Sequence, residues 1–233
     1  MITAQLPIRT AVMSDVNYLN ETIVEDLAME FATIEGASMI QNNDQSGSTT
    51  TTTGSTNGLR GLNYYTSAST AAYGSSGYAI TDGIHSIATV SQAGASIAYD
   101  DIVNLCNALP APYWSLPCTA WMMHPSTIQA LRKLKGSTGG APMFVEIGDD
   151  DGGALAYVFG FPVIPNPNMD TIGSGKFSVY LANWMRFVTI ADVEEMTVQA
   201  MEQTQAGFIT LYAEKRLVSS VRDPFAGVRL VGV

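Results

Sequence analysis

Two histidines are the residues that could most readily do chemistry in this sequence of 233 residues. An imidazole beside a serine and an aspartate could act as the general base of a hydrolase. His85 lies in a stretch rich in glycine and serine, and His124 precedes Pro125, where a helix is expected to begin. The sequence has no Gly-x-Ser-x-Gly motif that would expose a nucleophilic serine. We therefore predict no catalytic residue and expect His124 to occupy the helix N-terminus; an unrecognised Ser/His hydrolase is the alternative.

Two short motifs resemble sites for phosphate or metal. Gly173 to Lys176 reads Gly-Ser-Gly-Lys, but a phosphate-binding loop also needs Gly at 170 and Ser or Thr at 177, where the sequence has Asp170 and Phe177. Asp149, Asp150 and Asp151 begin like a calcium loop, but the residues that follow do not continue that pattern. We expect a turn at the first motif and a solvated loop at the second, with no cofactor and no metal.

The charge and the cysteines narrow the class of protein. A net charge of −10 argues against a sequence-specific reader of nucleic acid, which would need a basic face. Charged residues make up only 14% of the chain, against about 25% in ordinary domains, so we expect other subunits to cover part of the surface. The sequence contains no run of about 18 apolar residues, so it predicts no membrane-spanning helix, and its first residues do not form a secretory signal. Cys106 and Cys118 fit neither a disulfide framework nor common zinc spacings, which indicates two reduced, mostly buried thiols in a cytoplasmic product.

The first half of the chain must supply a long helix. Apolar residues at steps of three and four predict a helix over residues 14–40, with a stripe that must pack on a sheet. The stripe consists of Val16, Leu19, Ile23, Leu27, Phe31 and Ile34. Residues 42–61 contain the run Thr49 to Thr53 and have little to bury, which predicts a flexible exposed loop. Residues 62–98 give no firm assignment.

The second half predicts two helices and several strands, and hence an α+β chain. Asp100 is expected to cap a helix that Pro110 ends, and a second helix follows His124. Short strands are predicted at 119–123, 156–159, 160–163, 177–181 and 187–190, and longer strands at 195–201 and 208–218.

Six segments, in order along the chain, resemble the major capsid proteins of tailed phages. One is a helix similar to "la-x-x-fa-x-x-e-g-x-a", and another is a "W-x-M" strand followed by a helix and a glycine turn. The others resemble an "L-x-G-x-P-V" strand, the strand after it, and a closing "R-x-D-x-x-V-x-x-P-x-A-F". The residues concerned are Ile23 to Ala37, Trp121 to Met123, Ile128 to Gly140, Leu155 to Pro165, Phe177 to Tyr180 and Arg216 to Ala226. Gly175-Lys176 replaces the family's "G-D" pair.

The resemblance implies the Hong Kong 97 capsid fold: a peripheral domain with a long spine helix on an antiparallel sheet, and an axial domain. By analogy, residues 14–103 and 193–233 form the peripheral domain, residues 104–192 form the axial domain, and residues 1–13 are a short N-terminal segment. The family's N-terminal arm and its extended hairpin, the E-loop, precede such a helix, so we expect both to be missing here. No crosslinking lysine is therefore carried over.

The resemblance also implies a function. It predicts a structural, non-enzymatic subunit of a phage or prophage capsid that forms pentamers and hexamers and encloses DNA without sequence preference. Such a protein belongs to the virion and, during assembly, to the host cytoplasm. An encapsulin-like nanocompartment shell is the alternative within the same fold. A carbohydrate- or protein-binding module is supported only by the tyrosines between 64 and 78.

Two loops of the expected axial domain are the candidate assembly contacts, because neither has an obvious intramolecular use. The residues are Gly136, Gly139, Gly140, Asp149, Asp150 and Asp151. An ordinary mobile loop is the alternative for both.

Overall fold

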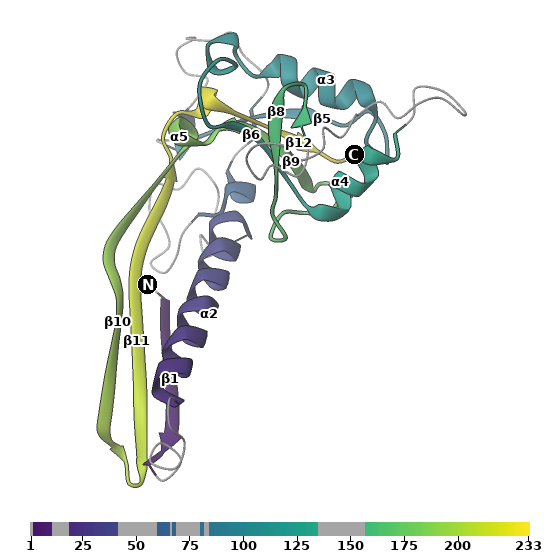
Figure 1. Ribbon diagram of the computed structural model, residues 1–233. Coiled ribbons are helices and arrows are strands. Elements are labelled where there is room, and N and C mark those ends of the chain that lie inside the picture. The colour runs from purple at the N-terminus through teal and green to yellow at the C-terminus, as the bar shows by residue number, and fades with distance from the viewer. Residues whose placement is uncertain are drawn as a thin grey trace.

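The computed structural model describes residues 2–10, 19–41, 60–65, 67–68, 80–81, 84–134 and 157–233. These residues form two parts, which Figure 1 shows as a rounded upper part and a long extension below it. We call the first part the body; it contains a seven-stranded sheet. We call the second part the arm; it contains a long helix and a three-stranded sheet, and it is not the N-terminal arm of the capsid family mentioned above.

The body is built on one mixed sheet whose centre is made by strands far apart in sequence. Strand β12 is parallel to β5 and antiparallel to β9, and β6 lies between β9 and β8. Two helices and three 3-10 turns pack around this sheet: α3 (Tyr99–Ala108), α4 (Pro125–Arg132), η1 (Leu62–Tyr64), η2 (Ala111–Tyr113) and η3 (Pro224–Ala226). The sheet order is β2 (Ser67–Ala68), β5 (Ile87–Ser91), β12 (Gly227–Val231), β9 (Phe177–Asn183), β6 (Thr119–Met123), β8 (Phe161–Pro165) and β7 (Tyr157–Val158). A separate short ladder pairs β3 (Ile80–Thr81) with β4 (Ile84–His85).

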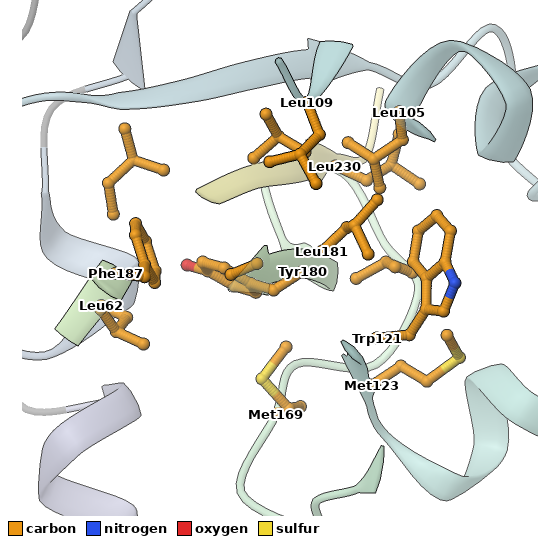
Figure 2. Packing of buried hydrophobic residues seen from close by; sticks show 14 of the residues in the cluster. Leu62, Leu105, Leu109, Trp121, Met123, Met169, Tyr180, Leu181, Phe187 and Leu230 are labelled. Atoms are coloured by element: carbon orange, nitrogen blue, oxygen red, sulfur yellow. The ribbon is translucent and has the colours of Figure 1, made fainter. Parts of the chain in front are cut away.

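The core of the body lies around β6, β9 and β12. Side chains from both faces of these central strands are buried, as a strand covered on both sides requires. Trp121 is fully buried, and its indole Nε1 donates a hydrogen bond to the Val158 carbonyl at 2.9 Å. Figure 2 shows Trp121 and Leu181 packed below Leu105 of α3. The predicted strand at 119–123 is confirmed.

The arm pairs helix α2 (Leu19–Gln41) with a sheet in the order β1 (Ile2–Arg9), β11 (Phe208–Val221), β10 (Val188–Gln205). All neighbours in this sheet are antiparallel, and Gly207, with φ +79°, makes the turn of the β10–β11 hairpin. Figure 1 shows α2 lying along this sheet. Lys215 Nζ of β11 lies 2.6 Å from Glu35 Oε2 of α2, and this hydrogen bond raises the pKa of the Lys215 ammonium.

The long helix and the two long strands agree with the sequence prediction, with some differences. Helix α2 begins at Leu19 among the described residues, since 14–18 lie outside them. Phe31 of the predicted stripe is buried, but Ile34 is 40% exposed, because the narrow sheet of the arm covers only part of the helix. Strands β10 and β11 extend beyond the predicted 195–201 and 208–218.

Three local predictions were wrong or incomplete. Helix α3 is capped at Ala98 and not at Asp100, because the buried Asp101 carboxylate accepts hydrogen bonds from the Ala93 and Ala98 amides. Residues Trp184–Phe187 form a helical turn, α5, so β10 begins only at Val188. Strand β1 was not predicted, although Ile2, Ala4, Leu6 and Ile8 alternate with Thr3, Gln5, Pro7 and Arg9 in the period typical of a strand.

The domain boundaries stay a prediction. The sheet pairing crosses them, however: β5 and β12 both lie outside residues 104–192, and both belong to the sheet that contains β9. The expected flexible loop at 42–61 lies outside the described residues except for its last two positions, which precede η1.

Gly227, the first residue of β12, is needed for close packing on α5. A Cβ added there would lie 2.5 to 2.8 Å from three ring atoms of Phe187, whose side chain is fully buried. We expect Gly227→Ala to lower the free energy of unfolding by about 1–2 kcal/mol, because the ring must shift within a packed core. Urea denaturation measures this effect. Gly94→Ala is the matched control, since its Cβ would meet nothing within 4 Å; equal losses in the two variants would contradict the packing argument.

Candidate functional site

The predicted assembly loops are not among the residues that the structure describes. Gly136, Gly139 and Gly140, and Asp149, Asp150 and Asp151, all lie within 135–156, outside the described part of the chain. Their role in assembly therefore stays a prediction.

His124 is a helix cap, as predicted, and its surroundings do not make a hydrolase site. Its Nδ1 accepts a hydrogen bond from the Ser126 amide at 3.1 Å and lies 2.7 Å from Ser126 Oγ. Although this serine is close enough to be activated, the contact is exposed, and it joins residues only two apart at the start of α4. Neither residue lines the large pocket described below. This geometry is that of a side chain capping a helix.

The Gly173–Lys176 motif forms a turn before β9, as predicted. The Lys176 amide donates to the Gly173 carbonyl at 3.1 Å, and Gly175 has φ +69°. The turn is tied to the end of β12, because the Gly175 amide donates to the Gly232 carbonyl and the Gly232 amide donates to the Lys176 carbonyl, both at 2.9 Å. Within the described residues, no group of three or more His, Cys, Asp or Glu side chains could hold a metal ion.

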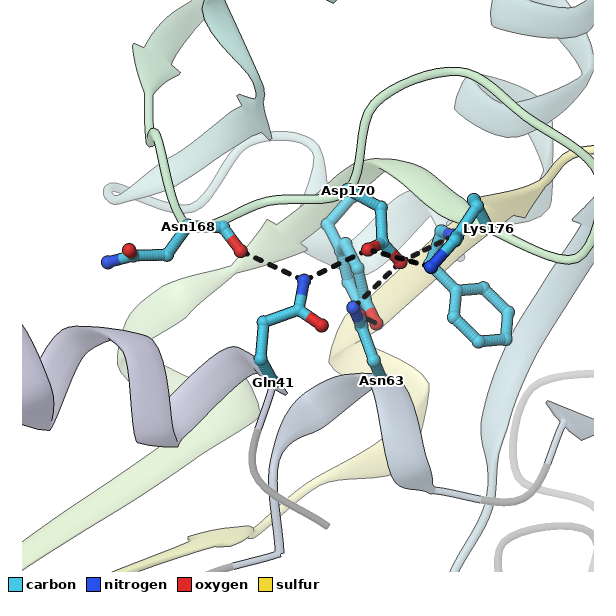
Figure 3. A network of polar contacts seen from close by, with 7 residues as sticks. Gln41, Asn63, Asn168, Asp170 and Lys176 are labelled. Atoms are coloured by element: carbon cyan, nitrogen blue, oxygen red, sulfur yellow. Dashed lines mark hydrogen bonds and ion pairs between the residues drawn. The ribbon is translucent and has the colours of Figure 1, made fainter.

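Asp170, the residue that breaks the phosphate-loop pattern, instead holds the end of α2 against the body (Figure 3). Its Oδ1 accepts a hydrogen bond from Gln41 Nε2 at 3.0 Å, and Gln41 is the last residue of α2. Its Oδ2 accepts from Asn63 Nδ2 at 2.9 Å and from the Phe177 amide at 3.1 Å. One carboxylate thus joins the arm helix, η1 and the start of β9.

A second buried group continues this network into the core. Arg229 of β12 is fully buried and donates to the Leu62 carbonyl at 2.8 Å and to the Tyr65 carbonyl at 2.6 Å. Its Nη1 also lies 3.4 Å from the Tyr180 hydroxyl, which donates to Asn63 Oδ1 at 2.8 Å. Burial raises the pKa of the Tyr180 phenol, and the positive charge of Arg229 acts in the opposite direction. The phenol therefore stays protonated and can donate.

An apolar pocket of about 560 Å³ lies where the arm meets the body. We call it the junction groove. Its walls come from α2 (Met39 and Ile40), from the body (Met122, Ile164 and Trp184) and from the arm sheet (Val188, Ile190 and Ser219). Ile164 and Ile190 are 43% and 53% exposed, so the groove presents apolar surface to solvent. No periodicity of the sequence could have predicted this groove, since its residues come from segments that meet only in the fold.

Both thiols were expected to be mostly buried, which is wrong for Cys118: it is exposed and lies on the groove. Cys106 is half-buried, and burial raises the pKa of its thiol. A raised pKa means less thiolate at neutral pH, and the thiolate is the reactive form. We expect Cys118 to be alkylated at least about tenfold faster than Cys106. Iodoacetamide labelling followed by peptide mass spectrometry tests this, with Cys118→Ser as the control; equal rates in the native chain would contradict it.

The outer face of the arm sheet, turned away from α2, is a second exposed surface. Register places Tyr212 and Glu214 on this face, where the Tyr212 hydroxyl donates to Glu214 Oε2 at 2.9 Å and this bond raises the pKa of the phenol. Val218 on the same face is 48% exposed. Figure 1 shows this sheet projecting well away from the body. Such a surface can contact other molecules along its whole length.

The described chain thus combines a long helix on an antiparallel hairpin sheet with a mixed α+β body. The chain belongs to the phage capsid family, whose model matches residues 1–231. It is a structural subunit of a capsid shell of the kind formed by tailed-phage major capsid proteins, as the resemblance in the sequence predicted.

Solved structures agree on the fold. The capsid of an empty GTA particle, computed with C5 symmetry, matches with a TM-score of 0.80 at 20% identity, covering 100% of this chain and 73% of that chain. A structure of Gordonia phage Cozz matches with a TM-score of 0.62 at 12% identity, covering 100% of this chain and 69% of that chain. The SrpI encapsulin of Synechococcus elongatus PCC 7942 matches with a TM-score of 0.60 at 15% identity, covering 100% of this chain and 73% of that chain. A search of the curated proteins found no match.

The α+β class and the Hong Kong 97-type fold predicted from the sequence are confirmed. The family is one of structural proteins, which agrees with the prediction of a non-enzymatic role. None of the helices in the described part of the chain combines the length and the apolar character that crossing a membrane requires.

Proposed function

We propose that this chain assembles into pentamers and hexamers that close into a shell around double-stranded DNA. The observation that carries the proposal is the family match over residues 1–231, together with the similarity to a capsid that has C5 symmetry. In a closed shell, each weak contact is repeated by symmetry, so a surface with few charges can still assemble stably. The proposed locations are the virion and, during assembly, the host cytoplasm.

The proposed contact with DNA is non-specific and weak. The net charge of −10 opposes tight binding to phosphates, and a shell wall does not need to read sequence. The proposed chemistry is therefore mechanical: the subunit encloses DNA and neither cleaves nor modifies it. No membrane partner is part of the proposal.

Electron microscopy of the purified chain, combined with nuclease treatment, tests this proposal. We expect rings or shells with five- and six-fold views that protect nucleic acid from nuclease. A chain that stays monomeric under all assembly conditions would contradict the assembly proposal. Shells that hold protein cargo and no protected DNA would favour the encapsulin-like alternative, which the similarity to the SrpI encapsulin supports at the level of the fold.

The loops at 136–140 and 149–153 are the proposed contacts between copies in the rings. Their sequence supports this role, because glycines let the backbone approach a neighbour and the three aspartates carry charge that a neighbour can pair. A variant with Asp149, Asp150 and Asp151 all changed to Asn should unfold at the same urea concentration but assemble poorly. Asp100→Asn, an exposed carboxylate on α3, is the control, and unchanged assembly in the triple variant would contradict the proposal.

A further inference from the structure

We propose that the junction groove binds a small amphipathic molecule with an apolar, flat body and one anionic group. Its volume of about 560 Å³ falls within the roughly 300–1,000 Å³ of typical ligand pockets. The proposal does not depend on shell formation, because all the walls come from one chain.

The apolar walls define the body of the ligand. Trp184 lines the groove together with Met122 of β6 and Ile164 of β8, and its indole Nε1 is already used, since it donates to the Ala120 carbonyl at 3.0 Å. Val188 and Ile190 of β10 add further apolar lining. Thioether and branched aliphatic side chains adapt to a flat ring, so an aromatic or fused-ring body is favoured over a sugar or a nucleotide.

The charge of the walls defines the polar end of the ligand. Among the lining residues that the structure describes, Arg60 is the one charged side chain and none is a carboxylate. The guanidinium, lying 5.7 Å from the Tyr65 ring centroid, has several donors and suits a carboxylate or sulfonate. Asn166 and Ser219 add hydrogen-bonding groups on the same walls.

Because the groove has walls from both parts, a bound molecule would hold the arm and the body in the arrangement described here. The ligand can bind only where α2, β8 and β10 stand together, so binding stabilises that arrangement by mass action. Binding should therefore raise the melting temperature of the chain as well as produce a signal from the ligand.

Two fluorescent probes test the proposal with the full chain. Anilinonaphthalene sulfonate carries an anionic group, and N-phenylnaphthylamine has a similar apolar body without one. We expect both to bind the folded chain. Ser219→Trp, which projects a large side chain into the groove, should weaken both at least about tenfold. Val218→Trp, one residue away and on the opposite face of β11, is the matched control and should bind as the unchanged chain does.

The role of Arg60 is tested by the difference between the probes. Arg60→Gln should weaken the sulfonate probe about fivefold and leave the neutral probe unchanged, as expected for a partly exposed ion pair. Arg216→Gln, on the exposed outer face, is the control. A loss of both probes with Arg60→Gln, or of neither, would overturn the assignment of the anionic end.

A second readout needs no variant. Saturating sulfonate probe should slow the alkylation of Cys118 at least about fivefold, since the thiol lies on the groove, and leave Cys106 unchanged. Unslowed alkylation, or binding that survives in a folded Ser219→Trp variant, would overturn the proposal. Probe fluorescence that falls as oligomers form would identify the groove as a contact between copies and would overturn it as well.

Discussion

Replacing Arg229 by methionine is expected to lower the free energy of unfolding by about 3–5 kcal/mol. The guanidinium is fully buried and donates to two carbonyls and to the hydroxyls of Ser67 and Thr89, at 2.9 and 3.1 Å. It also stacks on the Phe177 ring, with Cζ 3.8 Å from the ring centroid. Methionine fills much of the same volume but leaves these acceptors without donors, and each unsatisfied buried group costs free energy. Guanidinium chloride denaturation measures the loss.

Two further variants separate charge from geometry at this position. Arg229→Lys keeps the positive charge but loses the planar fork that reaches the Leu62 and Tyr65 carbonyls together, so it should lose more than half as much stability as methionine. Arg186→Met, at an exposed arginine of α5, is the control and should change stability by less than about 0.5 kcal/mol. Full stability of Arg229→Lys would show that charge alone is needed.

Asp170→Asn is expected to cost about 2–3 kcal/mol, because a carboxylate that accepts hydrogen bonds from three donors is replaced by an amide that cannot accept all of them. The asparagine side chain has one oxygen and one NH₂ group in place of the two carboxylate oxygens. In one orientation the NH₂ group faces Gln41 Nε2, and in the other it faces Asn63 Nδ2 and the backbone N–H of Phe177. None of these donors can accept its hydrogens. The Phe177 amide should then exchange its hydrogen faster. Urea denaturation and amide hydrogen exchange measure the two effects.

Gln41→Met isolates the part of this effect that concerns the arm. It removes only the bonds from α2 to Asp170 Oδ1 and to the Asn168 carbonyl, both at 3.0 Å, so it should cost about 1 kcal/mol and leave the Phe177 amide protected. Asp100→Asn serves again as the exposed control. Equal exchange of Phe177 in the Asp170→Asn and unchanged chains would show that the carboxylate does not hold the start of β9.

The elements with strong local patterns were predictable from the sequence. Helix α2 and the strands of the β10–β11 hairpin have apolar residues at regular spacing. Strand β6, which contains the W-x-M pattern, is a short apolar run whose two faces are both buried in the body. His124 was predicted as a cap because a polar residue followed by proline is typical of a helix start. These features depend on residues close in sequence.

The polar network and the groove depend on contacts that no local pattern contains. Asp170 drew attention only as a mismatch in a phosphate-loop motif, yet it bonds to Gln41, 129 residues earlier. Arg229 read as an ordinary charged residue, because only the fold brings the Leu62 carbonyl to it, 167 positions away. The one available signal was weak: an arginine within the apolar run from Gly227 to Val231 must be either exposed or fully bonded. The assembly loops were predicted from their sequence alone, and their role stays a prediction because they lie outside the described residues.

The position of β12 has a consequence for how the subunit is made. This strand sits between β5 and β9 in the body, although all its neighbours precede it in the sequence. During synthesis, the two strands β2 and β5 and the four strands from β9 to β7 must wait for β12 before they can join into one sheet. A nascent chain therefore lacks the strand that joins these two groups until nearly all of this sequence has been translated, and only then can it compete for a place among finished copies.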